Sequence, residues 1–106
     1  MFIEVTPGFA VRLEETQDFK RFKLVIAADR ADLAKLRRAL EGIASLAEDG
    51  PAWVSEDWLR GRAKDAAWQE GLSAMIAVAR KYGWVDEKVK TIRAHVEWAG
   101  GSAAKS

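Results

Sequence analysis

Residues 68–98 constrain the fold of this chain more than any other stretch, because a helix, a helix stop and a strand follow one another there. Apolar side chains first recur every three or four positions, which is typical of a helix with one buried face. This stripe consists of Trp68, Leu72, Met75, Ile76 and Ala79. We expect a helix over about residues 66–82, with Asp65 as its candidate start.

The end of this helix is specified by the local sequence. Gly83 suits the left-handed position that follows many helices, and two cations occupy the turn before it. Trp84 is then expected to fold back onto Val78 and Ala79.

A final strand follows this helix stop. Residues 91–98 alternate strictly, which predicts a half-buried strand. Its inward side chains are Ile92, Ala94, Val96 and Trp98, and its outward ones are Thr91, Arg93, His95 and Glu97.

Three short strands are predicted before the helical part of the chain, at residues 2–5, 9–14 and 21–28. Pro7 and Gly8 mark the first turn, and the polar residues 15–18 mark the second. Short turns of this kind predict an antiparallel meander. Its outward charges are Arg12, Glu14, Arg21 and Lys23.

The middle of the chain contains a second helical stripe of Leu33, Leu36, Leu40, Ile43 and Ala47. We expect a helix over about residues 30–48, capped by Asp29 and ended by Gly50 and Pro51. Residues 51–65 are less regular. Ser55 is a candidate cap for a short helix over residues 56–64, and one long helix through residue 82 is the alternative.

These elements predict an α+β fold of the order β-β-β-α-(short α)-α-β. We expect an antiparallel sheet of about four strands with two main helices packed on one face. The final strand is expected at an edge of the sheet, antiparallel to the first and third strands. Residues 1–99 form one domain in this scheme, and residues 100–106 form a disordered tail.

Composition excludes several classes of site. The chain has no cysteine and one histidine, which rules out disulfides, thiolate chemistry and a multi-histidine metal site. With 17 basic and 16 acidic residues, the charge does not favour a nucleic acid as partner. The sequence lacks a signal peptide and the ~20-residue apolar run that a membrane span needs, so we expect a cytoplasmic protein.

No catalytic or cofactor motif is present: GxGxxG, GKS/GKT, GxSxG, HExxH and the EF-hand spacing are all absent. His95 lies between Arg93 and Glu97 on the outward stripe, where a carboxylate can orient a histidine but no nucleophile accompanies it. We therefore expect no catalytic residue, metal or cofactor.

The candidate binding residues fall into two groups. Trp53 and Trp58 flank an irregular segment near Arg60 and Arg62, and aromatic surface beside cations is typical of ligand clefts and interfaces. Arg93 and His95 form the second group, on the outward stripe of the final strand.

Three functions compete for these residues. The first is a small intracellular binding or protein-interaction module without catalytic machinery, self-associating through a sheet edge or the region of Trp53 and Trp58. The alternative is a small enzyme or small-molecule binder with a cleft near these two tryptophans. A nucleic-acid-binding domain ranks third, because the net charge is only +1.

Overall fold

The computed structural model describes residues 1–47 and 50–98. Its strands are β1 (Phe2–Val5), β2 (Val11–Glu14), β3 (Lys23–Ile26), β4 (Ala44–Leu46), β5 (Ala52–Ser55), β6 (Val85–Asp86) and β7 (Thr91–Trp98). Its helices are the 3-10 helix η1 (Arg30–Asp32), α1 (Leu33–Ala39), α2 (Glu56–Arg60) and α3 (Ala66–Lys81). The α+β class is confirmed, and the predicted tail, residues 100–106, lies outside the described residues.

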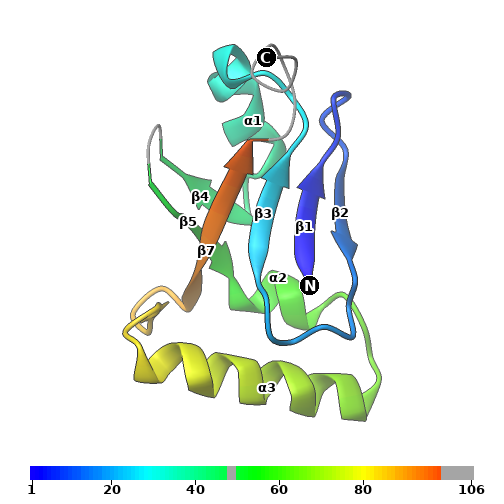
Figure 1. Ribbon diagram of the computed structural model, residues 1–106, viewed down its shortest axis with the longest axis vertical. Coiled ribbons are helices and arrows are strands. Elements are labelled where there is room, and N and C mark those ends of the chain that lie inside the picture. Colours follow the sequence, from blue (N-terminus) through cyan, green and yellow to red (C-terminus); the bar gives the residue numbers. More distant parts are fainter. Residues whose placement is uncertain (48–49, 99–106) are drawn as a thin grey trace.

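All strands belong to one curled, mixed sheet in the order β2-β1-β3-β7-β5-β4, with β6 also pairing with β7 (Figure 1). β1, β3 and β7 run parallel to one another, and the other pairs are antiparallel. β7 joins the two halves of the sheet. Its residues 91–94 pair with β5, and its residues 95–98 pair with β3.

The prediction of about four antiparallel strands is therefore matched only in part, since the sheet is mixed and has seven strands. The meander is wrong because the chain passes the start of β1 after β2, so that β3 pairs with the other edge of β1 in parallel. The final strand is also central rather than at an edge, and it is parallel to β3.

A hairpin in the middle of the chain accounts for the larger sheet. The helix predicted over residues 30–48 ends at Ala39. A turn over residues 40–43 follows, in which Gly42 takes a left-handed φ of 79°. β4 and β5 then pair, with Ser45 opposite Trp53. This hairpin occupies the place beside β7 that would otherwise be a sheet edge.

The two longer helices lie near opposite ends of the strands, as Figure 1 shows, and their buried residues share one core with the inward residues of the sheet. α1 covers the end where β3 and β7 finish, and α3 crosses the opposite end. Each closes the core with a buried stripe that the sequence pattern predicted. The buried helix residues are Leu36 in α1, Leu59 in α2, and Trp68, Leu72, Ile76 and Ala79 in α3, and the buried Leu40 directly follows α1.

Three predicted helix starts and one predicted helix stop are confirmed. The side chains of Asp29, Ser55 and Asp65 accept hydrogen bonds from backbone amides of the turns that follow them. At the end of α3, the Trp84 amide donates to the Ala79 carbonyl at 2.9 Å and the Gly83 amide to the Arg80 carbonyl at 3.1 Å. Those two bonds form a Schellman motif.

Replacing Gly83 with alanine is expected to lower the free energy of unfolding by about 1–2 kcal/mol, because its φ of +75° is unfavourable for a residue with a Cβ atom. Gly61 is the matched control, since its φ is −79° and an added Cβ would meet ordinary contacts at 3.5 Å. Chemical denaturation of both variants measures the difference. Equal effects at the two positions would contradict this account of the α3 stop.

Among residues 1–47 and 50–98, no helix is both long enough and apolar enough to cross a membrane.

Candidate functional site

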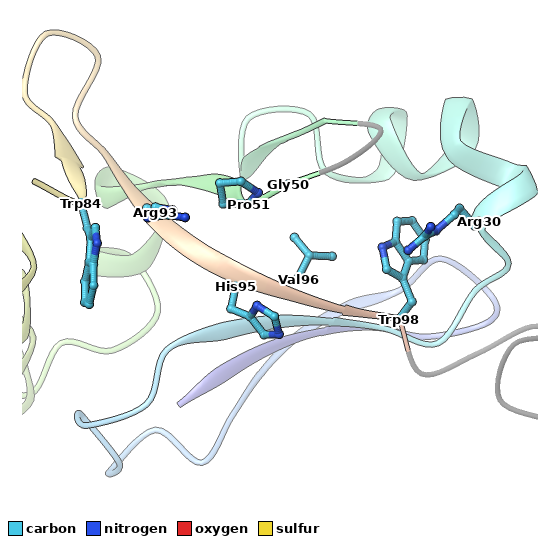
Figure 2. Close-up of a pocket in the computed structure, with 8 residues that line it drawn as sticks. All are labelled: Arg30, Gly50, Pro51, Trp84, Arg93, His95, Val96 and Trp98. Carbon is cyan, nitrogen blue, oxygen red and sulfur yellow. The ribbon is translucent and has the colours of Figure 1, made fainter.

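One cavity of the described structure is a groove of about 490 Å³ along β7, lined by side chains from both faces of this strand. Its described lining residues are Arg30, Gly50, Pro51, Trp84, Arg93, His95, Val96 and Trp98. Figure 2 shows Trp84 at one end and Trp98 with Arg30 at the other, with Arg93 and His95 between them. Arg93 and His95 are thus the two predicted site residues that the fold brings into one site.

Strand geometry places these two side chains. Arg93 and His95 alternate with the buried Ile92 and Ala94, so both point out of the core. Two residues along a strand separate them by about 7 Å, which is within the reach of one ligand carrying two negative groups. Both side chains are exposed.

The ionisable side chains of the groove are all basic. Arg30, Arg93 and His95 are its only ionisable lining residues within the part of the chain that the structure describes. Among those residues, none of the three side chains makes a hydrogen bond or an ion pair. Elsewhere on the same face, by contrast, the Lys23 amine pairs with the Glu97 carboxylate at 3.2 Å. The groove is therefore a local cationic site on a chain of nearly zero net charge.

Aromatic rings close the groove at both ends. Trp84 stacks on Tyr82 with ring centroids 4.8 Å apart, and its backbone oxygen accepts a hydrogen bond from the Arg93 amide at 2.7 Å. Figure 2 shows its indole nearly edge-on, with one face turned toward Arg93. At the other end, the guanidinium of Arg30 lies 4.7 Å from the ring centroid of Trp98. Both rings are thus held in place while part of their surface remains available.

Trp53 does not line this groove. It lies on β5 opposite Arg93 and is half-buried, although the two share the outer face of the sheet. Trp53 instead lines a shallow hollow of about 340 Å³ together with residues 42–45, Ser55 and Thr91. Trp58 is not part of that hollow, so these tryptophans do not form the two walls of one cleft there.

Arg60 and Arg62, two further predicted site residues, hold α2 in place. The Arg62 guanidinium covers the Trp58 ring at 4.5 Å and donates to the Trp58 carbonyl. Arg60 donates to Glu56 at 2.8 Å, and to Gln69 and Ser73 of α3 at 3.1 Å each. Both arginines thus have intramolecular roles that the sequence pattern did not reveal.

The groove has few side chains that could carry out covalent chemistry. Its described lining contains no serine, threonine, cysteine or carboxylate that could act with His95. Within the described ranges, no group of three or more His, Asp or Glu side chains could hold a metal ion. The arrangement is suited to binding: cations supply charge-assisted hydrogen bonds, and indole faces supply apolar contact.

Sequence reasoning missed six lining residues of this groove: Arg30, Gly50, Pro51, Trp84, Val96 and Trp98. Trp84 was assigned to the helix stop and Trp98 to the core stripe. Each ring is only partly buried, and each also lines the groove. The available signal was a tryptophan before the final strand and another at its last residue, on either side of Arg93 and His95 in the sequence.

The fold is α+β, and its groove along β7 is lined by basic and aromatic side chains. No protein-family model matches this chain, and comparisons with curated proteins and with solved structures find no match either. Function is therefore inferred from the geometry of the groove.

Proposed function

We propose that this protein is a binding module whose groove on β7 takes a partner carrying negative charge. The supporting observation is that every ionisable lining residue among the described residues is basic, and that its side chain makes no hydrogen bond or ion pair there. A buried or half-buried anion between such groups makes charge-assisted hydrogen bonds, which contribute roughly twice as much as neutral ones.

The proposal keeps the function expected from the sequence, a binding module, and moves its site. The region of Trp53 and Trp58 was the first candidate there, but Arg62 covers one ring and Arg60 is engaged with α3. Residues 48 and 49 are glutamate and aspartate and precede Gly50 of the groove, but they lie outside the described residues. Charge-neutral variants of both should accompany the measurement below.

A nuclear magnetic resonance titration with hexaglutamate at low salt tests the proposal. We expect the peptide to shift the amide signals of residues 93–98 and the indole signal of Trp84, because these groups surround the groove. Hexalysine should leave the same signals unchanged. Arg93→Ala should weaken hexaglutamate binding about tenfold, the loss expected for one charged hydrogen bond.

Arg12→Ala is the matched control, because Arg12 is an exposed arginine on the same sheet face but outside the groove. Its affinity should stay within about twofold of the parent, since a distant exposed charge is largely screened. Sedimentation at the same concentrations would show whether self-association accompanies binding. The proposal fails if hexaglutamate leaves residues 93–98 unperturbed, or if Arg12→Ala weakens binding as much as Arg93→Ala.

A further inference from the structure

A second cavity adjoins the groove where α3, the segment before β3, and β7 meet. It measures about 480 Å³ and is lined mainly by apolar side chains. Among them are Phe19, Phe22, Met75, Val78 and Ile92. Val78 is 53% exposed, so apolar surface of this cavity is accessible from outside the protein.

Trp84 and Arg93 line both cavities, so the apolar cavity and the cationic groove form one continuous surface. Trp84 is 41% exposed and lies between the apolar cavity and the groove with basic side chains. The charged described residues of the apolar cavity are Lys20 and Arg93, and both are basic. A partner that fills both cavities must therefore combine a bulky apolar group with negative charge.

Internal contacts shape the apolar cavity before any partner arrives. Phe19 packs against Trp68 with ring centroids 6.2 Å apart, and the Trp68 indole donates to the Thr16 carbonyl at 2.9 Å. A Cβ atom on Gly71 would come within 2.5 Å of the Phe19 ring, so this glycine allows the ring to pack closely against α3. The cavity wall is thus fixed by contacts within the fold.

The free edge of β7 favours a peptide over a small molecule. β5 pairs with β7 only as far as Ala52 opposite Ala94, and residues 95–98 pair with β3 on the other edge. On the side of Pro51, therefore, residues 95–98 have no strand partner within the described ranges. An extended peptide can use such an edge for main-chain hydrogen bonds.

We infer that the two cavities together bind an extended segment of another protein, in which a bulky apolar side chain is followed by acidic residues. The apolar side chain enters the cavity beside Met75 and Val78, and the acidic residues lie along Arg93, His95 and Arg30. This inference rests on the proposed function of the groove and adds the class of partner. Tryptophan, methionine and arginine are also the residues enriched at protein interfaces.

Fluorescence anisotropy with three labelled peptides tests this partner class on the full chain. The first peptide has one tryptophan followed by a run of glutamates, the second has serine in place of the tryptophan, and the third has lysines in place of the glutamates. We expect the tryptophan peptide to bind about tenfold more tightly than the serine peptide, because it buries an aromatic side chain. The lysine peptide should not bind.

Two variants of α3 locate the apolar contact. Ala74 and Ala77 are both exposed on this helix, but only Ala74 lines the cavity. Ala74→Glu should reduce the ratio between the tryptophan and serine peptides to about one, whereas Ala77→Glu should preserve it. The added charge is the same in both variants, and its effect on the two acidic peptides cancels in the ratio.

Several results would overturn the inference. If the two acidic peptides bind equally to the parent protein, the apolar cavity takes no part, and the proposed function of the groove still stands. If the lysine peptide binds as tightly as the glutamate peptides, both proposals fall. Displacement of the tryptophan peptide by dodecanoate at lower concentrations than by unlabelled peptide would assign the surface to a small amphipathic anion instead.

Discussion

Replacing Trp68 with alanine is expected to lower the free energy of unfolding by about 3–5 kcal/mol, the largest effect of any substitution considered for this protein. Trp68 is only 3% exposed, packs against Phe19, and donates its indole hydrogen bond to the Thr16 carbonyl at 2.9 Å. Truncation leaves a cavity beneath α3 and removes the main contact between this helix and the segment after β2. For a domain that is stable by about 5–15 kcal/mol, this loss is a large fraction of the total.

Trp68→Phe separates packing from hydrogen bonding. Phenylalanine keeps most of the apolar contact but cannot donate to Thr16, so we expect a loss of about 1–3 kcal/mol. Urea denaturation followed by circular dichroism measures both variants. If Trp68→Ala lowers the free energy of unfolding by less than Trp68→Phe does, the Trp68 side chain does not hold α3 against the segment after β2.

Replacing Arg60 with methionine is expected to cost about 1–2 kcal/mol. Its guanidinium connects Glu56 of α2 with Gln69 and Ser73 of α3, and the amide of Gln69 donates in turn to the Arg60 and Ala63 carbonyls. Hydrogen bonds to charged groups contribute about 1.5–3 kcal/mol when buried, and partial exposure of Arg60 reduces that contribution.

Arg62→Met provides the matched control in the same segment. Arg62 is exposed and makes one cation–π contact and one hydrogen bond, both to Trp58, so we expect a loss of about 0.5–1 kcal/mol. Thermal unfolding compares the two, since 1 kcal/mol shifts the midpoint by about 4–8 °C for a domain of this size. A larger effect at Arg62 than at Arg60 would contradict the assignment of Arg60 as the link between α2 and α3.

Local signals in the sequence predicted the local structure well. α3, its Schellman motif, the caps at Ser55 and Asp65, and the alternation of β7 each depend on neighbouring residues, and each is confirmed. The hairpin of β4 and β5 was missed because Leu40, Ile43 and Ala47 continue the helical spacing. Gly42, which is unfavourable inside a helix by about 1 kcal/mol, was the contrary signal.

Strand order could not be predicted, because it depends on partners far apart in the chain. Nothing in residues 15–22 distinguishes a short return to β2 from the observed passage to β1. Prediction of the site from the sequence is limited in the same way. Arg93 and His95 share a strand and were predicted together, whereas Arg30 and Trp84 reach the groove only through the packing of η1 and the end of α3.

The shared strand β7 also has a consequence for the order in which the protein acquires its structure during synthesis. β7 follows every other strand in sequence, yet β3 and β5 both pair with it. Until residues 91–98 leave the ribosome, those two strands therefore present open hydrogen-bonding edges. Such edges pair readily with other chains, so the interval before β7 docks is the period in which the nascent protein is most exposed to aggregation.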